Sequence, residues 1–104
     1  MVLYTVQATF TDARVADEWV AWLRDGHLAD VLRGGALDAE VVRLDGEALT
    51  YEVHYHFASP EAFARYEREF APALRAEGLA KFPSSRGVSY RRSVGAVVVQ
   101  AGPH

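Results

Sequence analysis

The 104-residue chain contains no cysteine, which excludes disulfide bonds, thiolate zinc sites and thiol nucleophiles. It also lacks an excess of basic residues: the formal net charge is −3, whereas a general nucleic-acid-binding protein normally carries a basic face. No apolar run approaches the roughly 20 residues of a membrane-spanning helix. The first residues show no basic segment followed by an apolar stretch, so we expect no signal peptide and a cytoplasmic location. We expect neither nucleic acid nor a membrane as a partner.

Apolar and aromatic residues, by contrast, are abundant. Half of the residues are hydrophobic, and the chain contains five Phe, five Tyr and two Trp. We therefore expect a packed core in which large rings dominate. The length fits one small domain over residues 1–104, of which about 100–104 form a flexible tail.

Three stretches alternate between apolar and polar side chains, which is the pattern of a strand with one buried face. They cover residues 2–10, 49–57 and, more weakly, 36–44, and a further stretch at 88–99 indicates a fourth strand. Between the second and third strands, Asp45-Gly46 predicts a two-residue hairpin turn of type I′.

Two segments show helical spacing. The apolar stripe of the first consists of Val15, Trp19, Trp22 and Leu23. Thr11 or Asp12 supplies its N-cap, and Gly26 is expected in the left-handed conformation that ends a helix, before a short second turn. The stripe of the other segment consists of Phe63, Tyr66, Phe70 and Leu74. Ser59-Pro60 is a typical helix start, and Pro72 predicts a kink or restart near Ala71.

The order β-α-β-β-α-β predicts an α+β, ferredoxin-like fold. Right-handed crossovers turn this order into a four-stranded antiparallel sheet, with spatial order 4-1-3-2 and both helices on one face. We call the other side of the sheet the open face. It carries Thr5, Gln7, Thr9, Thr50, Glu52, His54 and His56.

Two features of the sequence predict that a second copy covers the open face. Leu3 lies on this otherwise polar side, and the apolar run Val94–Val99 is unsuited to a free sheet edge. A two-fold homodimer would cover both, with the apolar tail crossing to the neighbouring subunit. Two sheets that face each other would enclose a cavity lined by the polar residues of the open face.

The sequence also resembles a known group of proteins. The residues concerned are Tyr4, Trp19-x-x-Trp22, His27-x-x-x-Val31-Leu32, Tyr51, Tyr55 and Phe70-Ala-Pro-Ala-Leu74-Arg75. From about Met1 to Val94 the pattern is similar to a family of short, uncharacterised bacterial proteins in the dimeric α/β-barrel superfamily. That superfamily includes antibiotic-biosynthesis monooxygenases, stress-response barrels and muconolactone isomerases. The resemblance implies the dimer and the cavity between facing sheets, but it assigns no catalytic residue.

Glu52-x-His54-x-His56 is the strongest candidate for chemistry, because a period of two places all three side chains on one strand face. Two histidines and a carboxylate are a known metal-ligand set. However, three positions along one strand span about 13 Å, too far to converge on one ion, so we expect no metal. The remaining alternatives are cross-strand hydrogen bonds, or a general base or ligand contact.

His27 is a third candidate. It follows the expected end of the first helix, where the helix dipole favours a protonated ring, and imidazole titrates near neutral pH. It would act as a general acid at the mouth of a cavity, or its ring would simply cap helix carbonyl groups. The catalytic candidates are therefore His54, His56 and His27, with none assigned.

Several other residues also allow two interpretations. Trp19 and Trp22 would stack on a flat ligand, although a pair on an apolar stripe is typical of a core, and the same holds for Tyr51 and Tyr55. Three arginines either bind an anion or form solvated ion pairs: Arg86, Arg91 and Arg92. No dinucleotide, phosphate-loop or Ser-His-Asp signature is present, and we expect no cofactor.

Three functions remain open. The first is a homodimeric protein that binds a small organic ligand between its facing sheets. The second is a cofactor-independent enzyme of isomerase or monooxygenase type, with His54 or His56 as a proton shuttle. The third is an interaction dimer without a ligand. The ligand-binding residues expected for the first two functions are Thr5, Gln7, Thr50, Glu52, His54 and His56.

Overall fold

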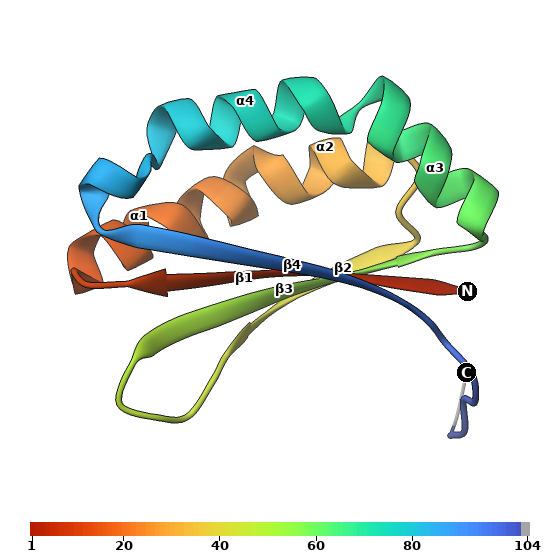
Figure 1. Cartoon of the computed structure of the whole chain (residues 1–104), viewed down its shortest axis with the longest axis horizontal. Helices are drawn as coiled ribbons and strands as arrows, with labels where there is room; N and C mark the ends of the chain where they lie inside the picture. The colour runs from red at the N-terminus through yellow and green to blue at the C-terminus, as the bar shows by residue number, and fades with distance from the viewer. Residues whose placement is uncertain (103–104) are drawn as a thin grey trace.

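The computed structural model describes residues 1–102 (Figure 1). The elements along the chain are β1 (Val2–Phe10), α1 (Ala13–Trp22), the π-helical segment η1 (Leu23–His27), α2 (Leu28–Arg33), β2 (Asp38–Arg43), β3 (Leu49–Phe57), α3 (Pro60–Glu69), α4 (Ala71–Lys81), the 3₁₀ segment η2 (Ser84–Arg86) and β4 (Val88–Ala96). The expected tail at 100–104 lies partly outside the described residues, at 103 and 104. None of the helices within residues 1–102 combines the length and apolar character needed to cross a membrane.

The strands form a four-stranded sheet in the order β2-β3-β1-β4, and each neighbouring pair is antiparallel. This confirms the predicted order 4-1-3-2. β1 lies in the centre, where Tyr4 is opposite Tyr55 of β3 and Val94 of β4. Figure 1 shows the helices stacked on one side of the sheet and nothing covering its other side in the described part of the chain. The fold is therefore ferredoxin-like, with one open face.

The core lies between the sheet and the helices, as the alternation in β1 and β3 predicts. Its fully buried large side chains are Leu23, Val31, Val53, Tyr55 and Phe57. Tyr4 of β1 contacts the rings of Tyr55 and Phe63 at centroid distances of 5.8 and 5.2 Å. Rings from strands and helices thus form one continuous aromatic layer.

The predicted helix starts and the predicted kink are confirmed. Asp12 Oδ1 accepts a hydrogen bond from the backbone N–H of Arg14 at 2.9 Å, and Ser59 Oγ accepts one from Ala62 at 3.1 Å. The predicted break at Pro72 separates α3 from α4 at Phe70, whose φ of −119° departs from helical geometry. These features depend on local side-chain chemistry, which the sequence displays directly.

Gly26 interrupts the helix as predicted, but the left-handed conformation expected for it is wrong. Its φ is 172°, which is extended and not left-handed, and this non-helical residue separates two helical stretches that meet at a kink within η1. The backbone N–H of Leu28 donates to the carbonyl of Leu23, five residues earlier, as in a π-helix. Single π-turns of this kind occur often at functional sites. His27 consequently lies directly after the kink, at the start of the second helical stretch.

The predicted two-residue hairpin at Asp45-Gly46 is also wrong. β2 ends at Arg43 and β3 begins at Leu49, so a longer loop joins them. A type I′ turn requires a positive φ at both central residues, but only Gly46 has one, at 148°. The outer strands are also shorter than predicted, since β2 begins at Asp38 and β4 ends at Ala96.

Candidate functional site

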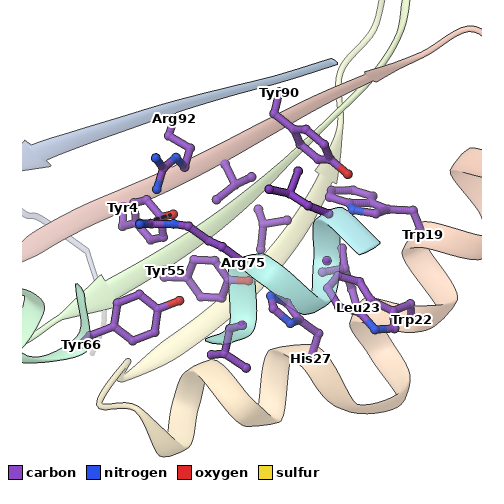
Figure 2. A pocket seen from close by; sticks show the side chains of 15 residues that line it. Tyr4, Trp19, Trp22, Leu23, His27, Tyr55, Tyr66, Arg75, Tyr90 and Arg92 are labelled. Carbon is purple, nitrogen blue, oxygen red and sulfur yellow. Dashed lines mark hydrogen bonds between the residues drawn. The ribbon is translucent and has the colours of Figure 1, made fainter. Parts of the chain in front are cut away.

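A cavity of about 190 Å³ lies between the sheet and the helices (Figure 2). The strands contribute Tyr4, Val6, Val53, Tyr55, Tyr90 and Arg92 to its wall. The helical segments contribute Trp19, Trp22, Leu23, His27, Tyr66, Leu74, Arg75, Gly78 and Leu79. The cavity is therefore mostly aromatic and aliphatic, with a small number of polar groups, which is the usual composition of a small-molecule site. It lies on the helix side of the sheet, opposite the open face.

One end of the cavity is formed by Trp22 and His27, whose rings stack with centroids 4.1 Å apart and an interplanar angle of 22°. Gly78 of α4 allows this stack, because a Cβ atom there would lie 3.2 Å from Cη2 of Trp22. Of the two tryptophans expected in the core, Trp19 is buried with 2% exposure, whereas Trp22 is only half-buried. Trp22 therefore presents part of its indole ring to the cavity.

The His27 ring is neutral at pH 7. Burial lowers its pKa, and the charge of Glu77 only partly opposes this effect. Among the described residues, His27 Nδ1 has no hydrogen-bond partner, although it is buried. A protonated ring would therefore bury an unpaired N–H donor as well as a charge. This reverses the expectation of a protonated ring, which considered the helix dipole and not the burial of His27.

The other end of the cavity carries positive charge. Figure 2 shows Arg75 reaching from α4 toward Tyr4, with Arg92 of β4 and Tyr66 of α3 around it. Arg75 Nη2 donates to Glu67 Oε1 and, at 3.5 Å, to the hydroxyl of Tyr4. Arg75 Nε is buried, and it has no hydrogen-bond partner within residues 1–102. The cavity therefore has an aromatic end at His27 and a guanidinium end at Arg75.

The open face holds a network of hydrogen bonds that includes most of the residues predicted to bind a ligand. His54 Nδ1 lies 3.0 Å from Glu40 Oε2, and its Nε2 lies 2.9 Å from Glu52 Oε1. Gln7 Nε2 donates to the other carboxylate oxygen of Glu52 at 2.9 Å. His56 Nδ1 lies 2.8 Å from an oxygen of Asp38. These hydrogen bonds join neighbouring strands, which agrees with the first of the two interpretations of Glu52-x-His54-x-His56 given by the sequence.

The predicted site residues of the open face do not form one cluster. Thr5, Gln7 and Glu52 line a groove beside Arg91, whereas Thr50 bonds to the hydroxyl of Thr9 at 3.1 Å. Within residues 1–102, no group of three or more His, Asp or Glu side chains is arranged to hold a metal ion.

The three arginines singled out in the sequence have different surroundings. Arg86 pairs with Glu18 and stacks over the Phe82 ring, with 5.3 Å to the centroid. Arg91 lies at the groove of the open face, and Arg92 borders this groove as well as lining the cavity on the helix side. Arg92 alone of the three therefore lies where a ligand in the cavity would contact it.

The sequence model of a family described as a domain of unknown function (DUF4286) matches residues 1–94. The chain belongs to this family. Its membership confirms the resemblance to an uncharacterised family over this range. No curated protein is similar to this DUF4286 chain in sequence.

Solved structures show what the DUF4286 fold is similar to. A dimeric ferredoxin-like protein from an uncultured marine organism superposes with a TM-score of 0.73 at 13% identity, covering 99% of this chain and 100% of the other. SnoaB, a cofactor-independent oxygenase from Streptomyces nogalater, gives 0.66 at 14% identity, with 99% and 97% covered. A Deinococcus radiodurans protein assigned to the antibiotic biosynthesis monooxygenases gives 0.63 at 12% identity, with 100% and 99% covered. At these identities the likeness establishes the fold alone.

In the DUF4286 chain, His27 of the helical layer and His54 of the open face are predicted to affect the stability of the fold in opposite directions when the pH changes. Hydrogen bonds to Glu52 and Glu40 raise the pKa of His54, whereas burial lowers that of His27. Stabilisation by His54 is therefore fully present below its unfolded pKa of about 6.5 and is lost as the pH rises through the higher folded value. His27 instead destabilises the fold as the pH falls below about 6.5, because only the unfolded chain binds the proton readily.

We expect the difference in unfolding free energy between wild type and His54→Gln to be larger at about pH 5.5 than at about pH 8.5. The matched variant His27→Gln should gain stability relative to wild type over the same fall in pH. Urea unfolding followed by circular dichroism measures both. If either variant differs from wild type by the same unfolding free energy at both pH values, the pKa shift described for that histidine would be contradicted.

Proposed function

We propose that this DUF4286 protein binds a planar organic molecule of one or two rings in the cavity between its helices and its sheet. One observation carries the proposal. The two buried side-chain nitrogens without a hydrogen-bond partner in the described chain, His27 Nδ1 and Arg75 Nε, both belong to residues of the cavity wall. Buried polar groups are nearly always paired, and unpaired ones are costly, so their concentration at one cavity favours a ligand that interacts with this region.

The size and walls of the cavity narrow the class of ligand. A cavity of about 150 Å³ accommodates benzene, and typical sites for drug-sized molecules begin near 300 Å³. The observed volume of about 190 Å³ therefore fits one or two rings. The rings of Trp22, Tyr55 and Tyr66 offer faces on which a flat molecule can pack.

Filling the cavity tests the proposal. Leu74→Trp replaces an isobutyl group of the cavity wall by an indole, and we expect it to weaken binding of 2-naphthamide at least about tenfold, because the space for the ligand is lost. Leu32→Trp is the matched control, since Leu32 is exposed on α2 and lies outside the cavity wall. Isothermal titration calorimetry gives both affinities. Undiminished binding to Leu74→Trp, or binding of neither 2-naphthamide nor 2-naphthoate to wild type, would overturn the proposal.

A cofactor-independent enzyme is the second candidate function, and the His27 side chain favours it. A neutral imidazole at the cavity wall is able to accept a proton from a bound acidic substrate. SnoaB, which shares the fold, is described as a cofactor-independent oxygenase. In this proposal His27 takes the role first considered for His54 and His56. Turnover of a found substrate that survives His27→Gln would leave binding as the function.

We also propose that the open face pairs with the open face of a second copy. The exposed valines after β4 and the dimeric state of the similar marine protein support this arrangement. A second cavity, between the two facing sheets, stays a prediction from the sequence. The residues that would line it are Thr5, Gln7, Thr50, Glu52, His54 and His56. The hydrogen bonds among Gln7, Glu52 and His54 favour a structural role for these side chains at the interface.

A further inference from the structure

We infer that the ligand of the cavity between helices and sheet is an aromatic carboxylate, held by its carboxylate group at Arg75 and Arg92. This inference rests on the proposed function, because it names the chemical class that the same cavity would select. Three features of the cavity carry it: the charge at one end, the unsatisfied donor there, and the uncharged aromatic surface at the other end.

The guanidinium end has one positive charge that no described residue neutralises. Arg75 forms an ion pair with Glu67, in which one charge offsets the other. Arg92 makes no ion pair within residues 1–102, although both arginines line the cavity. Its position opposite Val6 in the sheet register directs its side chain to the helix side, as Figure 2 shows. One negative charge on a ligand would balance this end of the cavity.

The donors at this end suit a carboxylate. The buried Nε of Arg75 lacks an acceptor, and guanidinium groups bind planar carboxylates through two parallel N–H···O bonds. The hydroxyl of Tyr4, which accepts from Arg75, lies at the same end. Burial raises the pKa of Tyr66 despite the nearby charges of Arg75 and Arg92, so its hydroxyl stays protonated and available as a donor. A carboxylate would thus meet several donors.

The opposite end of the cavity disfavours an anion and suits a ring. His27 is neutral there, and its ring stacks on Trp22. Leu23 and Leu74 add aliphatic side chains to the cavity wall. An aromatic acid would therefore bind in one orientation, with its carboxylate at Arg92 and its ring toward Trp22. A neutral amide of the same shape fills the same space but leaves the positive charge unbalanced.

The test compares 2-naphthoate with 2-naphthamide by isothermal titration calorimetry on wild type, Arg92→Gln and Arg91→Gln. We expect wild type to bind the carboxylate at least about tenfold more tightly than the amide, because hydrogen bonds to charged groups are roughly twice as strong as neutral ones. Arg92→Gln should lose most of this preference. Arg91→Gln, the neighbouring residue whose side chain lies on the other sheet face, should keep it. Raising the salt concentration should weaken binding of the carboxylate only.

The outcomes separate this inference from the function on which it rests. Equal affinity of wild type for the two compounds, or a preference unchanged in Arg92→Gln, would overturn the carboxylate assignment and leave the cavity as a binding site. Binding of neither compound to wild type would overturn the proposed function and the carboxylate assignment together. Because Arg92 is exposed, its replacement should leave the fold intact, which a thermal unfolding curve of each variant checks.

Discussion

Replacement of Trp19 by alanine is expected to lower the free energy of unfolding by about 3–5 kcal/mol, the usual cost of removing a fully buried large aromatic side chain. Trp19 is 2% exposed. Its indole packs against one ring from β1 and one from β3, with centroid distances of 5.4 Å to Phe10 and 6.2 Å to Tyr51. Its removal would leave a cavity that these strands, paired along their whole length, are poorly able to fill. Urea unfolding of the purified variant measures the effect.

Trp22→Ala provides the matched comparison for Trp19→Ala. The sequence places both tryptophans on the same apolar stripe and predicts similar burial. Both rings border the cavity, but Trp22 is half-buried whereas Trp19 is fully buried, so the loss of Trp22 should cost clearly less than the loss of Trp19. An equal or larger cost at Trp22 would contradict the described packing of the two rings.

The double variant Val98→Lys, Val99→Lys is expected to weaken the proposed homodimer about 100-fold or more. In the single chain these valines are 89% and 83% exposed, directly after β4. Burying one valine side chain contributes at least about 1.5 kcal/mol. Two of them account for about 3 kcal/mol, and each 1.4 kcal/mol is about a tenfold change in affinity. Sedimentation equilibrium should therefore give twice the chain mass of 11.5 kDa for wild type and a shift toward monomer for the variant.

Leu32→Lys serves as the control for this dimer prediction. Leu32 is an exposed apolar residue on α2, on the helix side and away from the open face, so its substitution should leave the dimer unchanged. A wild type that sediments as a monomer at micromolar concentration would contradict the dimer. Unchanged association of the double variant would contradict the crossing of the tail.

Features that depend on neighbouring residues in the sequence were predictable. β3 spans Leu49–Phe57 as its alternation predicts, and Ser59-Pro60 begins a helix because the cap and the proline act within one turn. The left-handed conformation expected at Gly26 and the hairpin expected at Asp45-Gly46 are exceptions with a common cause. A glycine permits a left-handed conformation but does not require one, and tertiary packing determines whether the chain adopts it. At Gly26 the backbone is extended instead, at the kink between two helical stretches, and His27 packs on Trp22.

The candidate site was less predictable, because it combines residues distant in the sequence. His27 was recognised as a candidate, but its neutral state depends on its burial in the fold, which the pattern did not reveal. Arg75 was missed, although a signal was present. It directly follows Leu74 of the apolar stripe and lies four residues after the buried Ala71, so the helical period places it toward the core side. The Tyr4 hydroxyl beside it belongs to another element, 71 residues away.

The most direct test of the ligand cavity is an NMR titration of ¹⁵N-labelled protein with 2-naphthamide and then 2-naphthoate. The chain contains two tryptophans, and both line the cavity, so their two indole N–H resonances are probes of its interior. We predict that both indole resonances shift saturably, while backbone amides of open-face residues such as His54 change little. Indole resonances that stay unchanged at saturating ligand, or shifts confined to strand amides of the open face, would contradict a binding site between the helices and the sheet.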